Sequence, residues 1–169
     1  MVARSRDAGG LRRGAGVCAL LLVLCAGCGD DFEADEYPSP GENAQIGDIL
    51  IRDFRLDHPP DDPYEPYPVG SDVFLYGWIV NEGDADERLL GASSPDAAGV
   101  ELVSGAGDVV PFPLPIPAES TVRMEAGELA LRVKGTEQVL ESGSPIDLRL
   151  VFEDAGETTV GVQVAIPAG

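Results

Sequence analysis

Apolar residues recur at every second position in several parts of this chain, which is the period of a half-exposed β-strand. The alternation is clearest in residues 129–134, 146–152 and 160–166. A longer segment, residues 73–80, is apolar on both faces, with Val73, Leu75 and Ile79 on one and aromatic residues on the other. That composition predicts a central strand of a sheet.

The remaining strand signals are shorter and are separated by turn residues. Residues 49–56 and 100–103 are rich in β-formers, residues 122–124 continue a strand, and residues 81–84 read as a turn. No amphipathic helical pattern stands out after residue 46. We therefore predict an all-β domain, a β-sandwich of seven to eight strands, and about 120 residues suffice to bury its core.

Two proline-rich segments interrupt this pattern. Residues 57–68 hold five prolines and must form a loop or an extended arm. In residues 111–117 every second residue is proline, which cannot donate to a β-ladder, so an edge strand or polyproline-like segment is expected. Its apolar residues either form a partner site or cover the open end of the sandwich, and we favour the cover.

The N-terminal residues predict export and lipidation. Four arginines precede an apolar run at residues 17–26, which is too short to span a bilayer and fits the core of a secretory signal. The run ends in Cys25-Ala26-Gly27-Cys28, a bacterial lipoprotein cleavage box with cysteine where leucine is commonest. Cys28 would become the diacylated N-terminus and anchor the protein to the extracytoplasmic side of the cell membrane. A plain secretory signal is the alternative.

Processing divides the chain into a signal peptide (1–27), an acidic flexible tether (28–45) and the β-sandwich domain (46–169). The whole chain has a net charge of −19, and the part after residue 27 keeps 7 basic and 29 acidic residues, a net −22. Such acidity excludes nucleic acid as a partner. It either serves solubility or steers a basic partner protein.

The order of four motifs resembles the PCu(A)C family of extracytoplasmic copper chaperones, in particular its actinobacterial lipoprotein branch. The motifs are residues 49–53, 81–95, 100–102 and 150–156, of which residues 88–95 and 152–156 are the most specific. The resemblance extends from residue 46 to residue 166. It implies a cupredoxin-like fold, in agreement with the predicted sandwich.

The resemblance also implies a copper(I) site of two histidines and two methionines, ligands that suit this soft ion. At the matching positions this chain has Val103, Ala130 and Arg132, and residues 104–120 contain no methionine. Ala130 and Arg132 are expected to face outward from one strand. We therefore expect the standard copper site to be lost, with His58 and Met124 as secondary metal candidates.

These observations predict a non-enzymatic binding module with a degenerate copper site, acting on a protein partner in the cell envelope. No nucleophile elbow, reactive cysteine or phosphate loop is present in the sequence. No cofactor is predicted, and copper enters only through the family resemblance. The alternative is a working copper chaperone or metal carrier for envelope or respiratory-oxidase metallation, using non-standard ligands.

Overall fold

The computed structural model describes residues 41–166, which form eleven β-strands. Within this range there is no helix that could cross a membrane. The all-β fold class predicted from the sequence is confirmed. The strands are β1 (Glu42–Ile46), β2 (Ile49–Leu56), β3 (Val73–Asn81), β4 (Glu87–Ser93), β5 (Ala97–Val103), β6 (Val109–Val110), β7 (Leu114–Ile116), β8 (Ser120–Met124), β9 (Ala130–Thr136), β10 (Pro145–Phe152) and β11 (Glu157–Val164).

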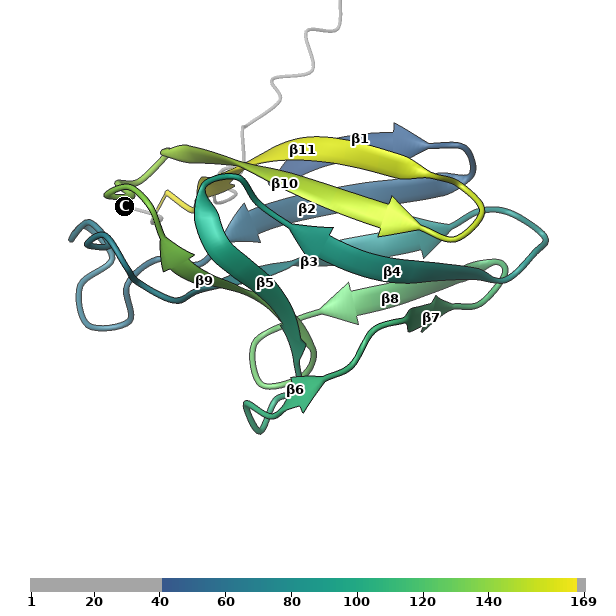
Figure 1. Cartoon of the computed structure of the whole chain (residues 1–169), viewed down its shortest axis with the longest axis horizontal. Helices are drawn as coiled ribbons and strands as arrows, with labels where there is room; N and C mark the ends of the chain where they lie inside the picture. Colours follow the sequence, from purple (N-terminus) through teal and green to yellow (C-terminus); the bar gives the residue numbers. More distant parts are fainter. Residues whose placement is uncertain (1–40, 167–169) are drawn as a thin grey trace, which may run out of the picture. The chain divides into compact units, whose positions relative to one another are not determined.

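All eleven strands belong to one sheet that curls back on itself (Figure 1). The order is β6-β5-β9-β3-β2-β11-β10-β4-β7, with β1 added to β2 and β8 added to β3. Most pairs are antiparallel, and the short pairing of β11 with β2 is parallel. One half of the sheet therefore faces the other, as in a sandwich.

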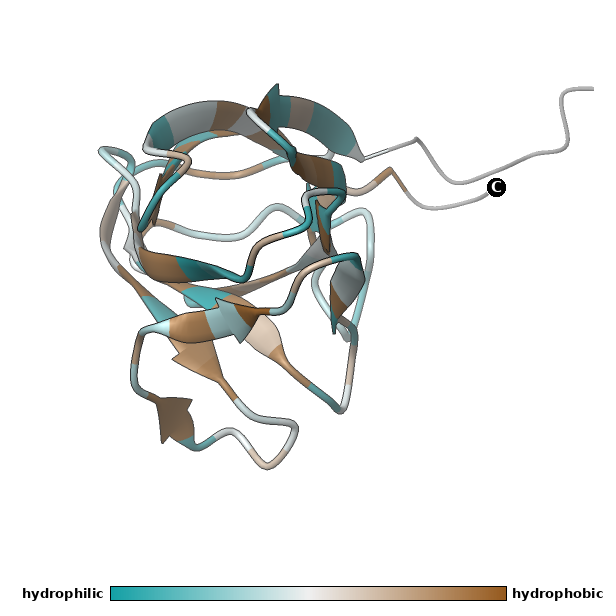
Figure 2. Ribbon diagram, turned by 90° about the vertical axis from the view of Figure 1, so that its right-hand side faces the viewer, coloured by the Kyte–Doolittle hydropathy of each residue, from teal (hydrophilic) through white to brown (hydrophobic). Residues whose placement is uncertain are grey.

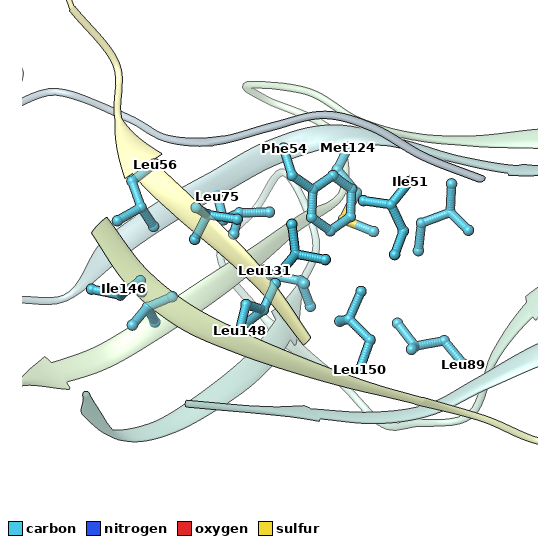
Figure 3. Close-up of a cluster of buried hydrophobic side chains, with 14 of the residues drawn as sticks. Ile51, Phe54, Leu56, Leu75, Leu89, Met124, Leu131, Ile146, Leu148 and Leu150 are labelled. Atoms are coloured by element: carbon cyan, nitrogen blue, oxygen red, sulfur yellow. The ribbon is translucent and has the colours of Figure 1, made fainter. Parts of the chain in front are cut away.

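The core fills the space between the two halves of the curled sheet. Apolar and polar residues alternate along the ribbons, as Figure 2 shows. Side chains from β2, β3, β4, β8, β9 and β10 meet in the interior (Figure 3). The predicted alternation in β10 is confirmed, since all four of its apolar members point inward. They are Ile146, Leu148, Leu150 and Phe152, each at most 2% exposed.

Eleven strands are more than the seven to eight expected, because β1, β4 and β6 lie outside the segments that the sequence pattern predicted as strands. β1, β6 and β7 have five, two and three residues. β6 and β7 lie at the two ends of the sheet order, so the edge position predicted for the proline-rich segment is confirmed. β1 begins at Glu42, inside residues 28–45, and pairs with β2.

The apolar residues of the proline-rich segment cover the core. Ile116 is fully buried, and Phe112 and Leu114 pack against the core cluster. The interpretation of this segment as a cover for the open end is thus correct. The other proline-rich segment, residues 57–68, is a connection between β2 and β3, as expected.

A buried carboxylate links the motif at residues 81–95 to the motif at residues 150–156. Glu87 begins β4, is 6% exposed, and accepts hydrogen bonds from the backbone N–H groups of the turn after β10. The donors are Glu153, Asp154 and Ala155, with Glu87 Oε2 to Ala155 N at 2.7 Å, and Arg88 N adds a further bond at 2.7 Å. Burial opposes ionisation, yet these backbone donors together hold the pKa of Glu87 below its usual value.

Candidate functional site

The residues that the family resemblance singled out lie together on the outer face of β5 and β9. In the antiparallel register Val103 stands directly opposite Ala130, and Glu101 stands opposite Arg132. On its other side Val103 pairs with Val109 of β6. Directly paired residues point to the same face of a sheet. Val109, Val103 and Ala130 therefore form a row across three strands, with Arg132 next along β9.

Ala130 lies on the predicted face, but the expectation that it is solvent-facing is wrong. Ala130 is 6% exposed and Val103 is 1% exposed. Two loops meet close by, after β5 and before β9. A Cβ atom on Gly105 would lie 1.9 Å from the carbonyl oxygen of Gly127, so these loops touch through backbone. The row is consequently closed and apolar where it meets the loops.

Arg132 lies beside this row, two residues after Ala130 on β9, and is paired with a carboxylate. Its Nη2 donates to Glu101 Oε2 at 2.6 Å, and Lys134 Nζ donates to Glu101 Oε1 at 3.2 Å. Hydrogen bonding by Arg132 and, secondarily, by Lys134 lowers the pKa of Glu101. The three charges form a compact cluster in which two cations share one carboxylate. Among residues 41–166 the buried Nε of Arg132 has no hydrogen-bond partner.

His58 and Met124 line a second location, a pocket of about 390 Å³ beside the ends of β2 and β8 and the middle of β3. His58 comes from the loop after β2, and its Nδ1 lies 3.2 Å from the carbonyl oxygen of Pro59. Met124 is fully buried at the end of β8. Asp57 and Glu125 also line this pocket. In the described part of the chain no three His, Cys, Asp or Glu side chains are grouped as a metal site would require.

An irregularity in β2 shapes the pocket. The register with β3 shifts between Arg52 and Arg55, and Asp53 adopts a positive φ of 54°. Gly77 of β3 lies against this bulge with φ 143°, and a Cβ there would approach Phe54 Cδ1 to 2.4 Å. Glycine is therefore required at position 77. The bulge lets Arg55 reach the carboxylate of Asp53 while both face the pocket.

Two tyrosines beside the pocket are held in their neutral form. Burial, the charge of Asp57 and the neighbouring Tyr76 raise the pKa of Tyr67 to about 12. Burial and Asp57 also raise the pKa of Tyr76. Both phenols therefore stay protonated to a higher pH than an exposed tyrosine does.

The structure thus separates the candidates into two groups. Val103, Ala130 and Arg132 are adjacent, as the resemblance implied, whereas His58 and Met124 line a separate pocket, with the Met124 side chain buried in the core. Glu101 was not singled out from the sequence as a site residue. Its position two residues before Val103 on one strand was the available signal, because such residues share a face. Cys28 lies outside the described residues.

A family model described as "Putative lipoprotein LpqE-like" matches residues 49–164, well over half of the chain. The chain belongs to the LpqE-like family. The match begins at the first residue of β2 and ends at the last residue of β11. It therefore includes both groups of candidate residues, and no curated protein matches the chain.

Solved structures of copper-chaperone domains share the fold. The copper-bound PCuAC domain from PmoF2 is 26% identical, with a TM-score of 0.61 over 74% of this chain and 98% of that one. The apo PCuAC domain from PmoF1 is 20% identical, with a TM-score of 0.62 over 74% and 99%. Copper(I)-bound DR1885 from Deinococcus radiodurans is 21% identical, with a TM-score of 0.54 over 72% and 79%.

These matches confirm the resemblance to the PCu(A)C family and the cupredoxin-like β-sandwich. A structure in this group holds copper, according to the description of the PmoF2 domain.

Proposed function

We propose that this LpqE-like protein is an extracytoplasmic, lipid-anchored binding module whose PCu(A)C-type copper site has lost its ligands. The observation that carries the proposal is the composition of the row on β6, β5 and β9. The row offers no imidazole, thioether or thiolate, and the Arg132–Glu101–Lys134 cluster lies beside it on the same face of β5 and β9.

Electrostatics argue in the same direction as ligand chemistry. Cu(I) prefers soft sulfur and imidazole donors, and none of the side chains in the row supplies one. The guanidinium of Arg132 would also repel a bound cation, and it already occupies the carboxylate of Glu101. A non-enzymatic role is consistent with relatives described as copper-binding domains, and a protein of the cell envelope is the partner we infer.

We expect no tight Cu(I) binding in a competition titration against a chromophoric chelator. The full chain should carry serine in place of its three cysteines, Cys18, Cys25 and Cys28. Free thiols would otherwise bind Cu(I) themselves. Zn(II) and Cu(II) are titrated in parallel. Stoichiometric, chelator-resistant Cu(I) binding would contradict the degenerate site.

The second candidate function is a metal carrier with non-standard ligands, and the shared pocket of His58 and Met124 favours it. An imidazole and a thioether form half of a typical Cu(I) ligand set. If Cu(I) binding is found, His58→Ala and Met124→Leu should each weaken it in this case. Neither substitution would affect a site on β5 and β9.

Membrane attachment through Cys28 is tested by Cys28→Ser. We expect the wild-type protein in the membrane fraction and the variant in the aqueous fraction, because two acyl chains anchor a protein stably. Detergent phase partitioning of both proteins measures the difference. Cys25→Ser is the matched control and should stay lipidated, since cleavage removes that residue. A Cys28→Ser protein that remains with the membrane would contradict the lipid anchor.

A further inference from the structure

The outer face of β2, β3, β8 and β9 gathers most of the positive charge in the described part of the chain. Residues 41–166 contain 24 acidic residues and only seven basic ones. Five of the seven point outward from these four strands: Arg52, Arg55, Arg123, Arg132 and Lys134. The two others, Arg88 and Arg149, lie on β4 and β10.

The register of β3 combines these cations with a row of aromatic rings. Phe74 is paired directly with Arg132 and Tyr76 with Arg55. Trp78 has an arginine on each side, Arg52 of β2 and Arg123 of β8. Every outward aromatic residue of this central strand therefore has an arginine as its cross-strand neighbour. We call these seven residues the arginine–aromatic face.

The two arginines beside Trp78 lack the partners that the other cations have. In residues 41–166, Arg55, Arg88, Arg132, Lys134 and Arg149 each have a carboxylate within 4.0 Å. Arg52 and Arg123 have none in that range, and Arg52 donates only to the backbone carbonyls of Ala44 and Ile51. In so acidic a domain, two arginines without a carboxylate partner among residues 41–166 leave positive charge available to an anion.

The aromatic side chains of this face are also partly exposed to solvent. The sequence predicted a strand apolar on both faces, yet Phe74 is 38% and Trp78 is 40% exposed. Phe74 and Tyr76 stack with their ring centroids 6.5 Å apart. Tryptophan, tyrosine and arginine are the residues that dominate binding energy at protein–protein interfaces, whereas a solvated sheet face is usually polar.

We propose that the arginine–aromatic face docks an acidic segment of a partner protein. Carboxylates of that segment would pair with Arg52 and Arg123, and its apolar side chains would cover Phe74 and Trp78. Charge complementarity favours an acidic segment at this face. The rest of the domain is strongly acidic and would repel such a segment, so the segment would bind only where the arginines lie. The proposal does not depend on the state of the copper site.

A lipid surface fits this face less well. Insertion requires apolar side chains that reach about 5–10 Å into the headgroup region. Here the rings of Phe74 and Trp78 are each about three-fifths covered by their neighbours, and Tyr76 is half-buried. The face is therefore suited to contact across a flat surface, as a protein partner provides.

Trp78 is the only tryptophan of the chain, so its fluorescence reports directly on the face. The probe is a synthetic peptide of Glu-Glu-Phe repeats, titrated at low salt into the full chain carrying Cys28→Ser. We expect a saturable change in Trp78 emission that weakens as salt is added. The double variant Arg52→Gln/Arg123→Gln should bind about tenfold or more weakly.

The matched control is Arg88→Gln/Arg149→Gln, which removes the same charge from β4 and β10. This control should bind the peptide as the wild type does. Equal weakening in both double variants would overturn the proposal, because it would reflect net charge alone. Two further results would also overturn the proposal. Saturable binding to phosphatidylglycerol vesicles without peptide binding would indicate a lipid surface as the partner. An emission change that depends only on protein concentration would indicate a second copy of this chain. Circular dichroism verifies the fold of each variant.

Discussion

A variant with two histidines and two methionines on the outer face of β6, β5 and β9 is expected to bind Cu(I) about a thousandfold more tightly than the wild type. The substitutions are Val103→His, Val109→Met, Ala130→His and Arg132→Met. A Cu(I) competition titration on the cysteine-free full chain measures the gain.

The strand register explains why these four positions should suffice. Val103 pairs with Val109 on one side and with Ala130 on the other, so three new ligands would stand in a row. Arg132 lies two residues beyond Ala130 on the same face of β9, and its replacement removes a cation as well as adding a thioether. The exposed Val109 is the position in the proline-rich region that the register places beside Val103.

Two controls make this result interpretable. Because Ala130 and Val103 are buried, larger side chains must displace the adjoining loops, and thermal unfolding shows whether the variant folds. Moving the two methionines to exposed Val69 and Val139 keeps the number of histidines and methionines and should abolish the gain. A folded variant without increased Cu(I) affinity would contradict the assignment of these positions to the ancestral copper site.

Glu87→Gln is expected to lower the free energy of unfolding by about 3 kcal/mol, and the midpoint of thermal unfolding by about 10 °C. The carboxylate accepts hydrogen bonds from four backbone N–H groups, three of them in the turn at residues 153–155. An amide has one acceptor oxygen and would present its NH₂ group to some of these donors. Those donors would then be left unsatisfied. Differential scanning calorimetry measures the loss.

The pH dependence of unfolding should change with the same substitution. The pKa of Glu87 is lower in the folded than in the unfolded protein. The ionised carboxylate therefore makes its full contribution to the free energy of unfolding at pH values above the unfolded-state pKa of about 4.3. The contribution is lost as the pH falls from that value through the lowered folded pKa. Glu87→Gln should therefore destabilise the protein at neutral pH and reduce the slope of stability against pH in the acid range.

Glu153→Gln is the matched control, because Glu153 lies in the same turn but its side chain is 45% exposed. Within residues 41–166 its one ion pair is a contact of 3.4 Å with Arg88, and its loss should change stability by less than about 0.5 kcal/mol. Equal destabilisation by both substitutions would mean that the carboxylate of Glu87 is not what holds the two motifs together.

The two proposals concern different parts of one sheet and fail independently. The copper proposal depends on Val103, Val109 and Ala130, whereas the docking proposal depends on Arg52 and Arg123 beside Trp78. Arg132 lies where the two regions meet, since it pairs with both Phe74 and Glu101. A chain that binds Cu(I) tightly could still bind an acidic peptide, and the separate variants distinguish these cases.

The sequence by itself determined most of the longer strands and the side of each that faces the core, because side chains alternate locally along an extended backbone. Residues 146–152 and 160–164 needed no tertiary information for their inward positions. The motifs likewise led to the fold, which the comparisons confirmed. The sequence also brought forward Val103, Ala130 and Arg132 as a group.

Tertiary structure decided whatever depends on contacts between distant segments. Only the pairing of β5 with β6 and β9 places Val109 beside Val103 and closes the face around Ala130. Likewise, only the pairing of β3 with β2 and β8 places arginines on both sides of Trp78. The carboxylate of Glu87 similarly reaches a turn more than 60 residues away. Alternation specifies which face a residue occupies, but the neighbours on that face come from strand register, which residues far apart in the chain set together.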